Sequence, residues 1–282
     1  MAAIDYEKEY DNRGNVPEHP EIFARWARET EAYRKAAAGA ELAISYGPSP
    51  RQTLDIFPAR GGGAKPPLAM FIHGGWWRSL DPAMFSQMAA GPNANGVTVA
   101  VVGYDLVPHV TVATITEQMR AATLALWRRY GQRIMVYGHS AGAHLTACLV
   151  ATDWTKLASD APHDLVPAGY AISGVFDLDP ILKVAPNQDI RLTAETARTC
   201  SPLTWRVPPD RTLDAVVGAL ESSEFLRQSR AIVEAWKNAA KVRYEAIPGT
   251  NHFTVVDALT DPNSAMTKRV VELAKEVAAM PL

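Results

Sequence analysis

The sequence lacks most features that mark secreted, disulfide-bonded or nucleic-acid-binding proteins. Its 282 residues include only two cysteines, Cys148 and Cys200, which form no CxxC pair and cannot build a disulfide framework. The formal net charge is −2, and no run of lysines and arginines occurs. The chain therefore has no strong field to attract nucleic acid or an anionic membrane, and we expect it to bind neither.

The sequence also predicts no targeting signal and no membrane-spanning segment. The first residues show no basic stretch followed by an apolar one, so no signal peptide is predicted. No uninterrupted apolar run reaches the ~18 residues of a membrane span. No HExxH or other paired metal-ligand spacing occurs. We expect a cytoplasmic protein without metal or cofactor that acts on a small molecule. The oligomeric state stays open, with a homodimer among the alternatives.

What the sequence does contain is a regular alternation of apolar runs and amphipathic segments. We predict strands in the apolar runs, at residues 53–59, 68–75, 96–106, 133–140, 167–178, 212–219 and 241–249. We predict helices at residues 17–38, 114–131, 141–152, 223–239 and 261–280. Strands that are apolar throughout and alternate with helices favour a mostly parallel sheet with helices on both faces.

This pattern predicts a single α/β domain over residues 1–282. Residues 1–45 form an N-terminal helical segment in this prediction, and residues 179–210 form a small insertion, or cap, over the active site. In such sheets ligands bind beyond the carboxyl ends of the strands. Candidate site residues should therefore come from strand ends.

One predicted strand end carries a serine between two glycines. The stretch "YGHSAGAH" at 137–144 contains Gly138-x-Ser140-x-Gly142 between a strand and a helix. In that context the motif holds the serine on a sharp turn with its hydroxyl exposed at the edge of the sheet. A serine can also simply cap the helix. The combination of strand, turn and helix favours Ser140 as a nucleophile.

A serine hydroxyl is a weak nucleophile and needs a base. The chain has seven histidines, and His252 is the one that follows the last predicted strand on a loop with turn residues around it. A histidine in that place suits the base of a serine triad. The alternative is a structural loop histidine.

The triad acid should lie between Ser140 and His252 in chain order. Glu221 stands just past the strand at 212–219, one strand before His252, and fits best. Four other carboxylates fall in the same interval: Asp177, Asp179, Asp214 and Glu224. The first two lead into the insertion, the third lies within a strand, and the fourth suits the dipole of a helix start. A solvated carboxylate remains the alternative for Glu221.

A glycine-rich strand end, "FIHGGWW" at 71–77, can supply backbone donors. Glycines allow N–H groups to approach a ligand closely, and acyl transfer needs such donors for its oxyanion. A tight turn would also explain the glycines. We predict an oxyanion hole from the N–H groups of Gly74, Gly75 and Ala141. The side chains that we expect around the substrate are Trp76, Trp77, His139 and Phe253.

These motifs together resemble the α/β-hydrolase superfamily and, within it, the arylformamidase (kynurenine formamidase) branch, which is related to hormone-sensitive-lipase-type esterases. The segments that carry the resemblance are "YDNRGNVPEHPEIFARW", "HGGWW", "YDLVP", "GHSAGAHL", "ISGVFDL", "SPL" and "ESSEFLRQS". The resemblance implies the α/β-hydrolase fold with Ser140 as nucleophile, Glu221 as acid and His252 as base. The branch often has aspartate at the acid position, where this chain has glutamate.

The resemblance also implies an activity. It is a serine hydrolase that cleaves a small N-formyl or N-acyl arylamine, similar to N-formylkynurenine, through an acyl-enzyme. A carboxylesterase that acts on small aryl or alkyl esters is the first alternative. The second is a non-catalytic binding protein with a hydrolase fold, which would have no reason to keep all three triad residues.

Overall fold

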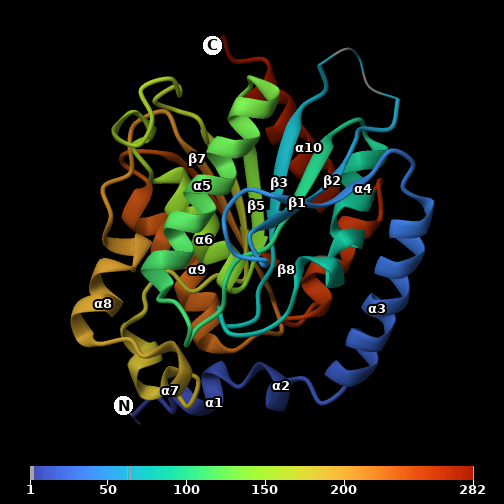
Figure 1. Ribbon diagram of the computed structural model, residues 1–282. Coiled ribbons are helices and arrows are strands. Elements are labelled where there is room, and N and C mark those ends of the chain that lie inside the picture. Colours follow the sequence, from blue (N-terminus) through green and yellow to red (C-terminus); the bar gives the residue numbers. More distant parts are fainter. Residues whose placement is uncertain (1–2, 62, 64, 282) are drawn as a thin grey trace.

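A central eight-stranded sheet organises the molecule (Figure 1). In this computed structural model, which describes residues 3–61, 63 and 65–281, the strands lie in the order β1-β2-β4-β3-β5-β6-β7-β8. β3 to β8 run parallel to one another, whereas β1 and β2 are antiparallel to their neighbours. The predicted, mostly parallel sheet is therefore confirmed. The strands are β1 (Glu41–Ser45), β2 (Thr53–Phe57), β3 (Leu68–Ile72), β4 (Thr98–Val102), β5 (Met135–His139), β6 (Ala168–Ile172), β7 (Thr212–Gly218) and β8 (Lys241–Ile247).

Helices cover both faces of this sheet (Figure 1). The α-helices are α1 (Tyr6–Tyr10), α2 (Asn12–Asn15), α3 (His19–Ala36), α4 (Ala90–Ala94), α5 (Val112–Tyr130), α6 (Ala141–Val150), α7 (Asn187–Ile190), α8 (Ala194–Thr199), α9 (Ser223–Trp236) and α10 (Ala265–Ala278). Short 3-10 helices are η1 (Pro82–Met84), η2 (Ser86–Ala89), η3 (Trp154–Lys156), η4 (Asp179–Lys183), η5 (Pro202–Thr204) and η6 (Thr254–Thr260). Across the described residues no helix is long and apolar enough to cross a membrane.

Each face of the sheet has its own apolar core. In β3, Met70 and Ile72 belong to the core shared with α5, α6 and α9, whereas Phe71 belongs to the core shared with α3 and α10. Alternate side chains of one strand point to opposite faces, so a strand that is covered on both sides must be apolar at every position. This requirement explains the uninterrupted apolar runs in the sequence.

The N-terminal part of the chain departs from the prediction at one place. Residues 41–45 form the edge strand β1, so the prediction of a helical segment that extends to residue 45 is wrong there. β1 is mostly exposed, and Ala43 has a positive φ of 55°. An exposed edge strand needs no apolar pattern, and its short sequence therefore gave no strand signal.

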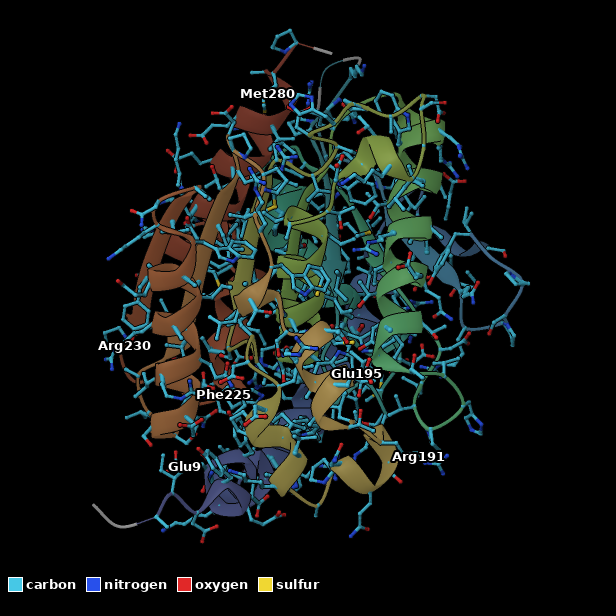
Figure 2. The ribbon with its side chains drawn as sticks, turned by 90° about the vertical axis from the view of Figure 1, so that its left-hand side faces the viewer. Glu9, Arg191, Glu195, Phe225, Arg230 and Met280 are labelled. Atoms are coloured by element: carbon cyan, nitrogen blue, oxygen red, sulfur yellow. The ribbon has the colours of Figure 1, made fainter. Side chains whose placement is uncertain are left out.

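The segment that contains α1 and α2 runs across the lower end of the molecule in Figure 1, beside α7. Its position is fixed by hydrogen bonds to α9. Glu9 Oε2 accepts from the backbone N–H of Glu224 at 2.9 Å and from Ser223 Oγ at 2.8 Å, so a residue of α1 satisfies free donors in the first turn of α9. Figure 2 shows Glu9 beneath this end of α9, on the same side as Phe225. Tyr10 adds a hydrogen bond from its hydroxyl to Glu224 Oε2 at 3.0 Å.

Candidate active site

Ser140 lies on a strained turn between β5 and α6. Its φ is 56° and its ψ −117°, a conformation that non-glycine residues rarely adopt. The turn is held because the Ser140 N–H donates to the carbonyl of Ile172 at 2.8 Å. Such local strain persists only where the surrounding structure enforces it. The predicted turn is therefore present, with its serine at the edge of the sheet.

The glycines on either side of Ser140 are required by close backbone contacts. A Cβ on Gly138 would lie 2.4 Å from the carbonyl oxygen of Gly142, and a Cβ on Gly142 would lie 2.0 Å from that of Ile72. No side chain fits at these distances. The G-x-S-x-G spacing thus reflects how closely α6 approaches β3 and β5.

His252 lies within hydrogen-bond distance of Ser140. Its Nε2 is 3.1 Å from Ser140 Oγ, and its Nδ1 is 2.7 Å from Oε2 of Glu221. An ionised carboxylate can only accept, so Nδ1 carries the proton and Nε2 is free to accept one from the serine. All three side chains are more than nine-tenths buried. The structure thus brings together the three residues predicted as a triad.

The carboxylate of Glu221 is oriented by two further donors. Its Oε1 accepts from the backbone N–H of Gly218 at 2.6 Å and from the hydroxyl of Ser173. With Oε1 occupied, Oε2 is directed at His252. Ser173 follows β6 with a φ of 54° and is fully buried.

Three of the four competing carboxylates have other side-chain partners. Glu224, which we expected only to suit a helix start, is buried and bonded to Tyr10 and Arg227. Asp214 pairs with Arg269 at 2.8 Å, and Asp177 lies 3.4 Å from Arg227. None of these contacts involves His252.

The three residues predicted to donate to an oxyanion lie at two chain segments near the serine. Gly74 and Gly75 line the cavity above Ser140, and Ala141 begins α6. In the described part of the chain, the N–H groups of these three residues have no hydrogen-bond acceptor. Gly75 has a φ of 106°, and a Cβ there would lie 2.4 Å from the carbonyl oxygen of Ser79. Free donors near a serine hydroxyl can stabilise the oxyanion that forms on a carbonyl oxygen when the hydroxyl attacks its carbon.

Two buried histidines support this arrangement without carrying charge. His139 Nε2 is 2.7 Å from the carbonyl oxygen of His252, which holds the loop that carries His252 against β5. Burial, with the neighbouring His252, lowers the pKa of His139 well below its usual 6.5. His73 stacks on Tyr104 with ring centroids 4.4 Å apart, and burial lowers its pKa to about 4. Both imidazoles are therefore neutral at pH 7.

A cavity of about 390 Å³ opens over Ser140. Of the four predicted substrate-binding side chains, Trp76, His139 and Phe253 line it. The prediction for Trp77 is wrong, because its side chain is fully buried and packs edge-on against His144 with ring centroids 5.0 Å apart. The two adjacent indoles lie at 67° to each other, one toward the cavity and one into the core.

The predicted insertion covers the cavity only in part. Residues 184–186, 188 and 189 line the cavity. The later part of the insertion, α8 and η5, packs instead against η4, α6 and α9 at the side of the molecule. The prediction that residues 179–210 as a whole lie over the site is therefore corrected to this short stretch.

Two contributions to the site were not predicted. The N-terminal segment supplies Tyr10 and Asn12 to the cavity wall, and Ser173 supplies the donor to Glu221. Both contributions lie in segments that resemble the arylformamidase branch, "YDNRG" and "ISGVF". That resemblance is the sequence feature that could have indicated them. Among the described residues no group of three or more His, Cys, Asp or Glu side chains could hold a metal ion.

Comparisons with known proteins identify a family and relatives for this chain. Residues 69–233 match the family model described as alpha/beta hydrolase fold. Kynurenine formamidase from Danio rerio is 30% identical over 241 residues, which cover 82% of this chain and 80% of that protein. Kynurenine formamidase from Salmo salar is 31% identical over 242 residues, which cover 82% of this chain and 81% of that protein.

Solved structures share the architecture. A crystal structure from Silicibacter sp. tm1040, provisionally named a thioesterase, superposes with a TM-score of 0.87 at 29% identity. The superposition covers 95% of this chain and 99% of that chain. A truncated carbohydrate esterase from gut microbiota has a TM-score of 0.69 at 16% identity, with 86% of this chain and 98% of its own covered. At that identity the second likeness concerns the fold alone.

Proposed function

We propose a function from one premise: this chain belongs to the α/β-hydrolase superfamily and, within it, to the arylformamidase (kynurenine formamidase) branch. Its relatives support a hydrolase of the arylamide or ester type. The finer proposal is a serine hydrolase that cleaves small N-formyl or N-acyl arylamines, similar to N-formylkynurenine. The observation that carries it is the chain of contacts from Ser140 through His252 to Glu221, with free N–H donors beside the serine.

The mechanism follows from these positions. His252 Nε2 takes the proton of Ser140 as Oγ attacks the carbonyl carbon, and Glu221 stabilises the imidazolium that forms. The N–H groups of Gly74, Gly75 and Ala141 bind the oxyanion, and each such donor typically contributes ~3 kcal/mol to the transition state. His252 then protonates the leaving nitrogen. Water repeats the sequence on the acyl-enzyme and releases the acid.

The lining of the cavity favours an aryl group on the substrate. Phe23, Trp26, Trp76 and Phe253 place aromatic rings along its wall. Aromatic rings bind one another edge-on or offset, which suits an arylamine. About 390 Å³ is at the small end of the range of ligand pockets, as a small acylated arylamine requires.

A second candidate is an esterase or thioesterase that acts on small acyl groups. The provisional name of the Silicibacter structure, at 29% identity over 95% of this chain, favours it. The same serine, base and oxyanion donors perform either reaction, so fold and triad do not decide between them.

A substrate panel tests the proposal. Formyl, acetyl and ester derivatives of one aryl group are compared by kcat/KM on the full chain. We expect the N-formyl arylamine to be turned over and Ser140→Ala to be inactive. Ester turnover with no amide turnover would overturn the formamidase proposal in favour of the esterase.

A fluorophosphonate probe separates an enzyme from a binding protein. We expect it to label the wild type but not Ser140→Ala. The matched control is Ser229→Ala, which removes a buried hydroxyl on α9 that makes no hydrogen bond to any described residue. Failure of the wild type to react would favour a non-catalytic binding protein.

A further inference from the structure

Asn12 is a mostly buried polar residue in the wall of the main cavity. Only 9% of the residue is exposed. Its neighbours Asp11 and Asn15 bond backbone groups of the segment, the N–H of Gly14 and the carbonyl of Lys8. The carboxamide of Asn12 makes no hydrogen bond to any residue that the structure describes. The amide is not among the fully buried side-chain groups without a partner, so it reaches the open space of the cavity, where a bound molecule can meet it.

The position of Asn12 indicates where that partner binds. Ser140 lines the main cavity, and Glu221 lines a second, smaller cavity of about 270 Å³. In the described residues, Asn12 and His252 are the two that line both cavities. Asn12 therefore shares both cavities with the imidazole that delivers a proton to the leaving group. The amide of Gln87, by contrast, is fully buried without a hydrogen-bond partner among the described residues, and Gln87 lines neither cavity.

The chemistry of the leaving group then distinguishes amides from esters. In the tetrahedral intermediate of a secondary amide, nitrogen carries one lone pair and one hydrogen. The lone pair must face the Nε2–H of His252, which transfers its proton as the C–N bond breaks and the oxyanion reverts to a carbonyl. The hydrogen on nitrogen consequently points away from His252 and needs an acceptor of its own. An ester oxygen has no such hydrogen.

We propose that Oδ1 of Asn12 accepts the N–H hydrogen of the scissile amide, so that Asn12 makes the site selective for amides over esters. The inference rests on the proposed function and adds a residue to it. A hydrogen bond that forms fully only in the transition state raises kcat more than it lowers KM. Its loss leaves a polar group unpaired in a buried site, which costs about tenfold or more in rate.

The test is the ratio of two activities measured on the same enzyme. An N-formyl arylamine and the formate ester of the matching phenol are compared for the wild type, Asn12→Leu and Asn12→Asp. We expect Asn12→Leu to lower kcat for the amide about tenfold or more and to leave the ester within about threefold. Asn12→Asp keeps an oxygen acceptor and should restore the amide-to-ester ratio. Because both substrates meet the same protein, a folding defect cancels in the ratio.

Two outcomes would overturn the inference, and they differ in what else they overturn. If the wild type cleaves the amide but Asn12→Leu leaves the ratio unchanged, Asn12 is only part of the wall and the proposed function stands. If the wild type cleaves no amide, the proposed function fails and the role of Asn12 fails with it.

Discussion

The hydroxyl of Ser173 donates a hydrogen bond to Oε1 of Glu221, the oxygen that does not face His252. Ser173 follows β6, whereas Glu221 follows β7, so two adjacent strands together orient one carboxylate. The N–H of Gly218 is the second donor to the same oxygen. With both donors present, the rotation of the carboxylate is fixed and Oε2 is directed at the imidazole.

Removing the Ser173 hydroxyl should therefore reduce activity without removing any group that touches the substrate. We expect Ser173→Ala to lower kcat about tenfold, because a hydrogen bond to a charged group is lost and the carboxylate becomes free to rotate. Steady-state kinetics on the preferred substrate measure this. Ser229→Ala, which removes another buried hydroxyl, is the control. Equal losses in the two variants would indicate a general packing effect instead.

Two glutamates separated by two residues should respond differently to the same change. Glu221→Gln should lower kcat about 10³- to 10⁴-fold, because an amide in place of the carboxylate disturbs the tautomer of His252 and no longer stabilises its cation. Glu224→Gln should keep kcat within a few-fold and lower the melting temperature, since Glu224 bonds Tyr10 and Arg227. The reverse result would reassign the acid.

The two adjacent tryptophans should separate binding from stability. Trp77→Ala opens a hole in a fully buried part of the core and should cost about 3–5 kcal/mol in the free energy of unfolding. Trp76→Ala changes the cavity wall, so we expect a higher KM with a small change in stability. Urea unfolding and substrate kinetics on both variants measure this. A KM effect confined to Trp77→Ala would contradict the placement of these rings.

Stability should depend on pH through buried neutral histidines. Burial lowers the pKa of His144 from 6.5 to about 4. The unfolded chain therefore takes up the proton first as the pH falls. The stability contributed by neutral His144 is fully present above pH 6.5 and decreases toward about pH 4, and the loss at about pH 5 is about 2 kcal/mol.

A variant that cannot titrate tests this assignment. In His144→Gln the amide nitrogen can still donate to the Cys200 carbonyl, which the His144 ring bonds at 2.8 Å. We expect its free energy of unfolding, measured in urea, to fall less than that of the wild type between about pH 7.5 and about pH 5. The expected difference is about 2 kcal/mol. The same slope in both proteins would place the titration elsewhere.

The sequence was informative wherever the chemistry lies at the ends of predicted strands. Ser140 and His252 follow β5 and β8, and the carboxyl ends of parallel strands share one edge of the sheet. Glu221 could be selected because chain order and the strand before it left few competitors. These inferences required only the strand pattern and the order of residues along it.

Other parts of the site depend on geometry that no local pattern encodes. Trp76 and Trp77 have the same side chain and similar positive φ values, 56° and 54°, yet one lines the cavity and the other lies in the core. Asn12 reaches the cavity from a polar segment with no periodicity to predict its place. A serine after a strand, such as Ser173, has many structural uses, and only the fold shows which acceptor it meets.

The docking of Tyr10 on Glu224 has a consequence for folding during synthesis. The two residues are separated by 214 positions in the chain. At about 5–20 residues per second, the segment around Tyr10 leaves the ribosome on the order of 10–40 seconds before its partner exists. Contacts so distant in sequence form late. One wall of the cavity is thus made from residues that are synthesised early and stay undocked until α9 has formed. During those seconds the segment is exposed, and chaperones can bind it.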